Sequence, residues 1–580
     1  MSDKPDHTRD VIYHPPRSKK SKLPTTSIAP IGLDTEADVT GETFMICTSL
    51  GDVWTPDRFP ACMFDRKHRD RAYVTWNLKY DMGALLQTLP VENLEQLRKF
   101  DKTTVGEYRY RVIANKLLSI SKGKKHVQIY DMMGFYKSSL DKAAKKYLDD
   151  AKINVGSKSF DHYDIQYRWE EIAEYCVQDC ILTARLADKF IKQLNSWGMH
   201  VRKLYSTAHI SYAWFSSKCG HPSVGWIWRF QRTVLNYAMA SYAGGKFEVT
   251  KKGPGYFYEY DLVSAYPHSI RDLVDLDNAR IVWSDRYRKY AVYGFLDCTM
   301  IIPPAIPSPV AVKRGYLNTY PAGEIRKIIT KREYEYLIES GCDVTINSAC
   351  WIHVDKKNYL YRDEIDRLFT LKSSIDKDAD KMAYQTVKVL MNSLYGKFVQ
   401  LIPQGDLWRA GSSWNPIFAS YITAETRVRV SELQRQYPSV RAVHTDSIIS
   451  DEKLDYPESS SLGSLSYEIE GQGLIAGCGV YQIGKKTALR GVPSKIPLLE
   501  LCRNSGQTLN IENTRSKTWR QVLATGHPVE EINLFVDAIK QLRPDSDKKR
   551  IWLSDSRDWQ ELRTRTIESL PLVYARSLYQ

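Results

Sequence analysis

The sequence predicts a protein of several domains that combines α/β and α+β architecture. The chain has 580 residues, which is more than one ordinary domain holds. Apolar residues make up 43% and charged residues 26%, a composition that allows sizeable buried cores. Residues 27–197 alternate short apolar strands with amphipathic helices, which is typical of an α/β unit. No run of about 18 apolar residues occurs, so a membrane span is not expected.

The patterning divides the chain into seven expected segments, in which particular strands and helices can be assigned. The segments are a loose basic arm at 1–25, an α/β domain at 26–200, a connecting segment at 201–255, the first part of a second domain at 256–355, a helical block at 356–400, the second part of that domain at 401–495, and a C-terminal unit at 496–580. Strands are expected at 43–47 and 72–76, helices at 169–195 and 417–434, a hairpin at 441–450, and irregular Pro-rich structure at 301–330. A Gly-Gly hinge is expected in the connecting segment, within SYAGGKF.

Charge and aromatic content point to a polyanionic partner. Lys and Arg number 82 against 68 Asp and Glu, a formal net charge of +14. The 37 Tyr and 14 Trp add side chains on which nucleic-acid bases stack. The ten Cys form no CxxC pair, and Cys176 and Cys180 read as packing residues. A zinc module or disulfide framework is therefore not expected, and a reducing cytoplasm is the expected setting.

Three short stretches of the first domain carry carboxylates in a pattern that suits catalysis. Asp34 and Glu36 alternate on one strand and so share a face, and Asp81 follows the strand AYVTW at a strand-to-helix turn. Tyr175 and Asp179 are one turn apart on the long helix. Each stretch alone has a plainer interpretation. The first would be an exposed strand, the second a helix cap, and the third a hydrogen bond on the protein surface. Together they match the needs of two-metal phosphodiester hydrolysis, with Tyr175 orienting the attacking water.

The second domain contains two further carboxylates at strand ends. Asp261 ends a strand just before Pro267, a residue suited to the start of a helix, and Asp446 lies at the tip of the hairpin AVHTDSII. An ordinary helix start is the plainer interpretation of the first. Two carboxylates from separate strands are nevertheless sufficient to hold a metal pair for nucleotidyl transfer.

A polar stripe follows the helix KVLMNSLYG, which is expected to close at Gly396. Lys388, Asn392 and Tyr395 are spaced as i, i+4 and i+7 on an otherwise apolar helix. Lys381 extends this face backward, and Lys377 extends it by one more turn. A solvated helix face is one interpretation. The other is a triphosphate cradle in which lysines meet phosphates and Tyr395 packs on the new base pair.

These motifs resemble two known sets. IGLDTEAD, NLKYD and YCVQD resemble the three exonuclease motifs of the DEDD superfamily in its tyrosine subclass. DLVSAYP, KVLMNSLYG and HTDS resemble motifs A, B and C of family B DNA polymerases, and within that family the chain looks most like the compact protein-primed polymerases of phages and linear plasmids. The resemblance implies a ribonuclease-H-like 3′–5′ exonuclease domain and a right-hand polymerase. The palm would be 256–355 and 401–495, with a terminal-protein-region-like insertion in its first part, the fingers 356–400 and the thumb 496–580.

The resemblance also implies roles for individual residues. Asp261 and Asp446 would bind the polymerase metals beside the Val263 carbonyl, and Tyr266 would exclude a 2′-hydroxyl. The nucleotide would further contact Lys372, Lys388, Asn392 and Tyr395. DNA would contact Asn77, Tyr80, Tyr242, Gly244, Gly245 and Ser447.

The implied cofactor is Mg²⁺ or Mn²⁺, two ions per active site. The implied partners are a DNA primer-template and deoxynucleoside triphosphates, with a terminal protein left open, and a monomer is expected in the cytoplasm of a bacterial or archaeal host or of a virus-infected cell. The alternatives are a catalytically silent nucleic-acid scaffold, a gap-filling enzyme that is not protein-primed, and an enzyme that copies or makes RNA. Tyr266 argues against the last of these.

The sequence departs from the family pattern at several places. His444 replaces the first Asp of D-T-D-S, and Ala265 replaces a Leu. The stretch 397–416 is short and carries Pro403, Gly405, Gly411 and Pro416, where relatives hold a longer hairpin that encircles DNA. We therefore expect an open ring or a closure by another segment, with 301–330 as the candidate. Tyr481, Lys485 and Lys486 are near the position of the thumb-side Lys-x-Tyr motif, but not in its register.

Overall fold

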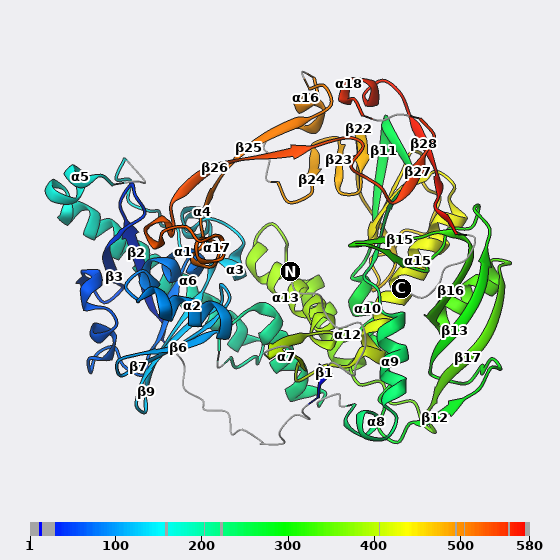
Figure 1. The fold of residues 1–580 in the computed structure, drawn as a ribbon, viewed down its shortest axis with the longest axis horizontal. Helices are drawn as coiled ribbons and strands as arrows, with labels where there is room; N and C mark the ends of the chain where they lie inside the picture. Colours follow the sequence, from blue (N-terminus) through cyan, green and yellow to red (C-terminus); the bar gives the residue numbers. More distant parts are fainter. Residues whose placement is uncertain are drawn as a thin grey trace.

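The structure is a computed structural model that describes residues 11–13, 29–156, 160–201, 203–220, 224–404, 407–492, 496–503, 505–554 and 557–574. Two bodies lie side by side, and a long ribbon formed by β25 (Leu509–Ser516) and β26 (Phe535–Leu542) bridges them (Figure 1). The predicted combination of α/β and α+β architecture is confirmed. Among the described residues, no helix combines the length and apolar character that a bilayer crossing needs.

The first body is an eight-stranded sheet with helices packed on it. Its strands run in the order β4-β3-β2-β5-β9-β8-β7-β6, and β2, β5 and β9 are parallel to one another. Their bounds are β2 Ile31–Ala37, β3 Thr43–Thr48, β4 Val53–Trp54, β5 Ala72–Thr75, β6 Lys102–Val105, β7 Tyr108–Ile113, β8 Leu117–Lys122 and β9 Lys125–Asp131. The main helices are α1 Leu78–Leu86, α2 Val91–Phe100, α4 Leu140–Tyr147 and α6 Trp169–Ser196. The strands expected at 43–47 and 72–76 and the helix expected at 169–195 are thus confirmed.

A glycine allows α6 to approach β2 closely. A Cβ on Gly32 would lie 1.8 Å from the Cys180 carbonyl oxygen, so no other residue fits there. This close approach places the carboxylates of β2 opposite those of α6.

The second body is built on a nine-stranded sheet. Its main path runs β10-β20-β21-β11-β22-β23-β24, and β27 and β28 attach through β11. The bounds are β10 Lys246–Val249, β11 Lys251–Leu262, β20 Val440–Thr445, β21 Ser447–Ser450, β22 Leu465–Gly477, β23 Val480–Ile483, β24 Lys486–Leu489, β27 Arg550–Trp552 and β28 Ile567–Pro571. Two helices, α10 (Ala265–Arg271) and α15 (Pro416–Gln436), pack together beside it. The predicted helix at 417–434 and hairpin at 441–450 are confirmed, whereas Pro267 lies inside α10, two residues after the helix begins.

A separate five-stranded sheet corrects the expectation for 301–330. It has the order β12-β17-β13-β16-β29, with β12 Arg280–Trp283, β13 Tyr293–Ile302, β16 Ala322–Thr330, β17 Asp343–His353 and β29 Val573–Tyr574. Residues 322–330 therefore form a regular strand, because residues 323–330 pair in continuous register with residues 295–302 of β13 despite the prolines before them. A short pair, β14 (Val312–Arg314) and β15 (Leu317–Thr319), lies within the same stretch.

Helices connect the two bodies. They are α7 Thr207–Lys218, α9 Arg232–Ser241, α12 Arg362–Ser374, α13 Lys381–Ser393 and α14 Tyr395–Phe398. One buried cluster contains Trp76 and Phe190 of the first body together with Leu390 and Trp414, so the bodies share a continuous core. The helical block expected at 356–400 is confirmed, since α12, α13 and α14 all lie within it.

Both ends of the chain pair with distant strands. Residues 11–12, inside the arm expected to be loose, form β1, which pairs in parallel with β19 (Leu407–Ala410); the rest of 1–25 lies outside the described residues. β19 and β18 (Leu401–Gln404) form a short hairpin in the stretch 397–416. At the other end, β28 pairs with β11 and β29 with β16. The segment 496–580 is therefore partly integrated into the two sheets of the second body.

Candidate active sites

The predicted residues of the first body converge on one cluster. Asp34 and Glu36 come from β2, Asp81 from the first turn of α1, and Tyr175 and Asp179 from α6. Each of the four carboxylates interacts electrostatically with others of the set. Asp81 lies within α1 and accepts a hydrogen bond from Thr35 Oγ1 at 3.0 Å, so it is not the helix cap; the N-cap position belongs to Asn77.

Burial and mutual repulsion make these carboxylates hard to ionise. Burial is the largest cause, and it raises the pKa of Glu36 to about 8 and that of Asp81 to about 7. The pKa of Asp34 is also raised, by burial and then by the charges of Asp81 and Glu36. Among the described residues, Asp179 Oδ1 is buried without a hydrogen-bond partner. A divalent cation would satisfy this oxygen and remove the repulsion, so the donor set fits such an ion.

The thiol of Cys176 lies in the same cluster but acts as packing. Its sulfur and one carboxylate oxygen each from Asp34 and Glu36 lie within 4.8 Å of one another. Burial raises the thiol pKa well above its usual range, so the group stays protonated. Cys176 and Cys180 are both fully buried, as the sequence predicts for packing residues.

Lys152 belongs to this site and was missed from the sequence. Its ammonium group forms an ion pair with Asp179 and donates a hydrogen bond to the Tyr175 hydroxyl at 2.9 Å. Burial lowers the pKa of Lys152, but the charge of Asp179 and these bonds outweigh it and hold the pKa above its ordinary value. The residue lies between α4 and α5 (His162–Tyr167), where no periodic pattern singles out one lysine.

The carboxylates of the second body also meet. Asp261 is opposite Ser447 in the pairing of β11 with β21, and the Leu262 amide donates to the Asp446 carbonyl at 2.9 Å. Asp446 thus occupies the turn between β20 and β21, as predicted. The Val263 carbonyl accepts a hydrogen bond from the Gly463 amide at 2.7 Å, which leaves it one further lone pair.

The charges of Asp261, Asp446 and a lysine of α13 influence one another. Burial and then the charge of Asp446 raise the pKa of Asp261 to about 7, and burial raises the pKa of Asp446. The positive charge of Lys388 on α13 acts in the opposite direction on both. The site is therefore an acidic pair that faces an exposed lysine.

The other residues predicted to contact the nucleotide have partners within the protein, and the helix predicted to carry the polar stripe is divided in two. Lys372 donates to Ser264 Oγ at 2.9 Å, and the rings of Tyr266 and Tyr395 lie 4.3 Å apart. Asn392 Nδ2 donates to the Lys388 carbonyl at 2.9 Å. Two corrections concern the stripe: Lys377 precedes α13, and α13 ends at Ser393, so Tyr395 and Gly396 belong to α14. The stripe therefore spans two consecutive helices.

The expected Gly-Gly hinge is held from several sides. Arg427 of α15, which is fully buried, donates to the carbonyls of Ala243 at 2.7 Å and Gly244 at 3.1 Å. The Tyr320 hydroxyl donates to the Gly245 carbonyl at 3.2 Å. A Cβ on Gly245 would lie 2.6 Å from Thr445 and 3.1 Å from the Tyr266 hydroxyl. The glycine therefore allows the backbone to approach Thr445 and Tyr266 closely, and free movement is not its role.

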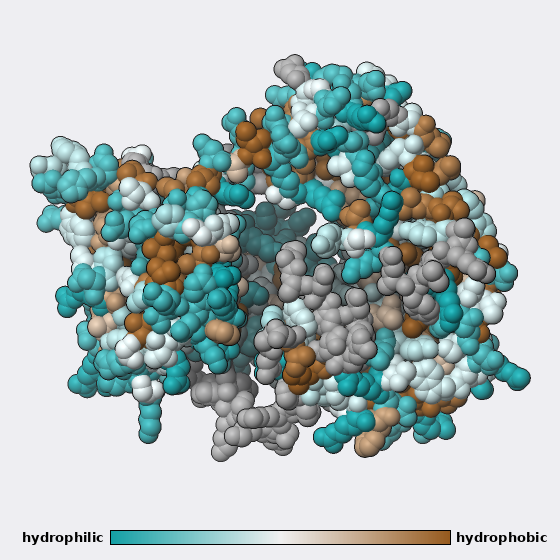
Figure 2. Space-filling view, in the orientation of Figure 1, coloured by the Kyte–Doolittle hydropathy of each residue, from teal (hydrophilic) through white to brown (hydrophobic). Residues whose placement is uncertain are grey.

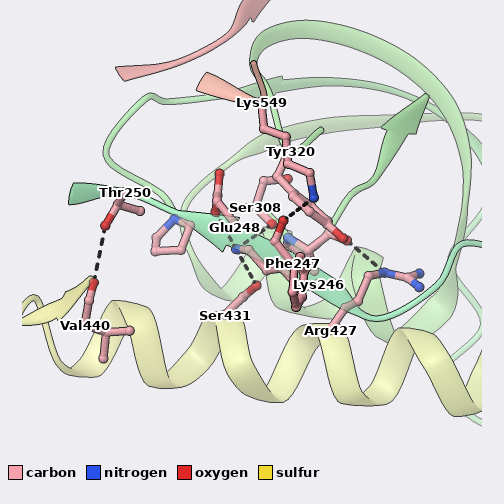
Figure 3. A network of polar contacts seen from close by, with 12 residues as sticks. Lys246, Phe247, Glu248, Thr250, Ser308, Tyr320, Arg427, Ser431, Val440 and Lys549 are labelled. Atoms are coloured by element: carbon pink, nitrogen blue, oxygen red, sulfur yellow. Dashed lines mark hydrogen bonds and ion pairs between the residues drawn. The ribbon is translucent and has the colours of Figure 1, made fainter. Parts of the chain in front are cut away.

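A polar network anchors the strand that follows this segment. Figure 3 shows Lys246 reaching from β10 toward α15, where it donates to Ser431 Oγ at 3.2 Å and to the Ser308 carbonyl at 3.0 Å. Lys549 donates to the Phe247 carbonyl at 2.5 Å. Neither Arg427 nor Lys246 was identified from the sequence, because nothing local distinguishes a buried cation from an exposed one.

The ring of His444 packs between aromatic side chains. Its ring stacks on Tyr481 at 4.8 Å and lies 4.7 Å from Phe247, and burial lowers its pKa to about 4. Tyr481 and Lys486 meet on the buried Glu259, at 3.2 Å and 2.6 Å. The substitution of Asp by His is thus accommodated in an aromatic pocket.

Comparisons with known proteins agree with this architecture. The family model described as "DNA polymerase type B, organellar and viral" matches residues 118–408. A probable DNA polymerase of Ascobolus immersus is 25% identical over 252 residues, which is 40% of this chain and 20% of that protein, so the chain spans about a fifth of this curated relative's length. Phi29 DNA polymerase with primer-template DNA and incoming nucleotide matches with a TM-score of 0.61 at 15% identity, over 89% of this chain and 99% of that one. Its binary complex with primer-template DNA gives 0.63, also at 15% identity, over 88% and 99%.

Proposed function

Since the chain belongs to the organellar and viral type B DNA polymerases, we propose that it is a DNA-directed DNA polymerase with its own 3′–5′ proofreading exonuclease. The observation that carries this proposal is the presence of two separate carboxylate clusters in two bodies. One combines Asp261 and Asp446 with lysines of the helical block, and the other combines four carboxylates with Lys152. A catalytically silent scaffold would have no need of both.

Each cluster would hold two Mg²⁺ or Mn²⁺ ions. In the palm the ligands are Asp261, Asp446 and the Val263 carbonyl, and in the exonuclease body they are the carboxylates of β2, α1 and α6. When bound, the ions supply charge neutralisation at the transferring phosphate and a more acidic bound water or hydroxyl.

The chain's own residues position the incoming nucleotide. Lys388 and Lys372 place two cations above the acidic pair, where a triphosphate would lie. The rings of Tyr266 and Tyr395 pack against each other. They would form a wall beside the sugar and base, where Tyr266 would crowd the 2′ position. The primer strand would follow Tyr242, Gly244, Gly245 and Ser447. Of these, Gly244 is held through its carbonyl by Arg427, and Gly245 through its carbonyl by Tyr320.

In the exonuclease body, Tyr175 and Lys152 would orient the attacking water and stabilise charge at the scissile phosphate. Asn77 and Tyr80, at the start of α1, would grip the single-stranded primer end. The enzyme would replicate a viral or plasmid genome as a cytoplasmic monomer, starting from the hydroxyl of a terminal protein. A gap-filling polymerase that uses ordinary primers is the second candidate, favoured by the short hairpin β18–β19.

One assay tests the proposal. The protein is given a primed DNA template and all four deoxynucleotides with Mg²⁺, with and without a candidate terminal protein, beside Asp446→Asn as the matched negative. We expect template-directed extension by the wild type only. A wild type that binds DNA but neither extends nor degrades a primer would support the silent scaffold instead.

A further inference from the structure

The tip of the ribbon β25–β26 is a folded knob, residues 517–534, rather than a tight turn. It contains α17 (Trp519–Thr525) and the short η4 (Val529–Glu531). Thr518 caps α17 through a capping box with Gln521, and Gly526 ends the helix in the left-handed conformation. The neck is closed by the Asn533 amide donating to the Lys517 carbonyl at 2.8 Å and by an ion pair between Lys517 and Glu531. The knob is therefore a compact unit of its own.

The apolar face of the knob is buried against the exonuclease body. Trp519 is 3% exposed, and Val522 and Ile532 are fully buried. All three belong to the same buried cluster as Leu94 and Leu97 of α2. Three large apolar side chains are thus removed from water at this contact, and the burial of that much apolar surface stabilises the docked position of the knob.

Polar contacts and two glycines complement this packing. Arg520 donates to the Arg98 carbonyl at 3.0 Å and to Asp101 Oδ1 at 2.5 Å. Asn533 Nδ2 donates to the Tyr80 carbonyl, and Gln87 Nε2 to the Ile532 carbonyl, both at 2.9 Å.

The two glycines are Gly41 and Gly83 of the exonuclease body. A Cβ on Gly83 would lie 2.5 Å from Asn533 Oδ1, and one on Gly41 would lie 2.9 Å from the Ile532 carbonyl oxygen. The surface of the exonuclease body is thus shaped to receive the knob.

The docked knob completes a closed path of protein. The exonuclease body is joined to the polymerase body through the shared core on one side, and through the ribbon and knob on the other. The ribbon forms an arch between the bodies (Figure 1), above a hollow in the surface (Figure 2). Residues 301–330, offered by the sequence as the closure, pack elsewhere: the Pro307 carbonyl accepts from the Tyr336 hydroxyl and the Pro309 carbonyl from Arg427.

The two faces of the ribbon differ in charge. Cross-strand partners share a face, so Lys540 (paired with Ile511) and Arg515 lie on one face, and Glu512 and Asp537 lie on the other. A face that carries cations without carboxylates suits a phosphate backbone.

We propose that the knob is a clasp that locks the thumb onto the exonuclease body and closes a ring of protein around the primer-template duplex. This inference rests on the proposed polymerase function. Opening the clasp would admit DNA, and closing it would keep the enzyme on the DNA between successive nucleotide additions.

The first test compares two substitutions on the same helix. Val522→Glu places a charge on the buried face of α17, and Ala524→Glu places the same charge on its exposed face. Product length after a single binding event, measured with a trap for released enzyme, should fall about ten-fold or more for Val522→Glu and stay unchanged for Ala524→Glu. Extension at saturating enzyme should stay within two-fold for both. Equal single-event lengths for the two variants would overturn the clasp, whereas a wild type that extends nothing would overturn the polymerase proposal.

The second test is topological and does not depend on how Val522→Glu folds. Asp101→Cys with Arg520→Cys, in a Cys219→Ser background, allows a short bis-maleimide to bridge the clasp. Cross-linked after loading on a primed circle, the enzyme should survive a high-salt wash and be released when the circle is cut. Cross-linked before DNA is added, it should fail to load on circles but still thread onto linear ends. Loading of the pre-linked enzyme on closed circles, or equal retention on circular and linear DNA, would show that the clasp does not enclose DNA.

Discussion

The two candidate catalytic sites differ in how complete they are before substrate arrives. In the exonuclease body, four carboxylates come from one sheet and two of its helices, and Lys152 already bonds Asp179 and Tyr175. In the polymerase body, two carboxylates come from neighbouring strands, while Lys372 and Lys388 come from separate helices and Lys388 is exposed. The first site is preorganised within one body. The second is assembled from separate elements, and under the proposed function the triphosphate of an incoming nucleotide would bind between its cations and its acids.

The largest expected effect tests whether these sites are truly separate. Asp34→Ala with Glu36→Ala should lower primer degradation by about 10³-fold or more, because the charge-stabilising centre is removed. Extension should remain within two-fold of the wild type, since Asp261 and Asp446 lie in the other body. Both rates are measured on one labelled primer-template, with nucleotides left out to isolate degradation. Loss of both activities would break the division into two sites.

Local sequence patterns explain why so much of both sites was predictable. Asp34 and Glu36 share a strand face and Tyr175 and Asp179 share a helix face, so short spacing alone places them. Asp261 and Asp446 could be identified equally well, because the first is next to the last residue of a strand and the second lies in the tight turn of a hairpin. The order of the motifs along the chain also predicted the order of the two bodies.

What the sequence missed depends on contacts between distant segments. Lys152 meets Asp179 only because an irregular segment folds back on α6, and Arg427 reaches residues 243–244 across more than 180 positions. Strand β16 was hidden by the prolines before it, although its partner β13 determines its structure. The docking of the knob depends on shape, including glycines at 41 and 83 whose role appears only when Ile532 and Asn533 are in place.

In the exonuclease body, Lys152 should contribute to catalysis as well as to the charge balance of the site. Lys152→Met should reduce degradation of a mismatched primer end by about 10²-fold, because a positioned cation is lost beside the water-orienting Tyr175. Lys145→Met, which removes an exposed lysine paired with Asp141 on α4, is the matched control. The measurement is single-turnover degradation, so that DNA binding does not contribute. Equal rates for the two variants would mean that Lys152 serves only to neutralise Asp179.

The corresponding prediction for the polymerase side concerns sugar choice. Tyr266→Val removes the ring that packs on Tyr395, and should raise ribonucleotide incorporation relative to deoxynucleotide by about ten-fold. Tyr266→Phe keeps the ring and should leave the ratio unchanged. Competing nucleotides on one template provide the ratio directly. If the ratio is the same in Tyr266→Val and wild type, another residue excludes the 2′-hydroxyl.

The last and smallest effect concerns what happens when the polymerase meets duplex DNA, where the two sites compete for one primer end. The hairpin β18–β19 has strands of four residues each, and within the described part of the chain the two residues of β1 are the one strand added to it. So short a wall leaves little protein to separate strands ahead of the primer, even if the clasp keeps the enzyme on the duplex behind it. We therefore expect efficient filling of single-stranded gaps and weak extension past a downstream strand without a helper protein.

At that block the stalled primer end should pass repeatedly to the preorganised exonuclease site, so that nucleotides are inserted and removed without net growth. Matched templates with and without a blocking strand, run with a trap and scored for both product length and nucleotide turnover, measure this directly. The Asp34→Ala, Glu36→Ala variant should abolish the turnover and extend somewhat further into the duplex. Equal product lengths on the two templates for the wild type would show that the short hairpin is sufficient for unwinding, and that the two sites do not compete at such a block.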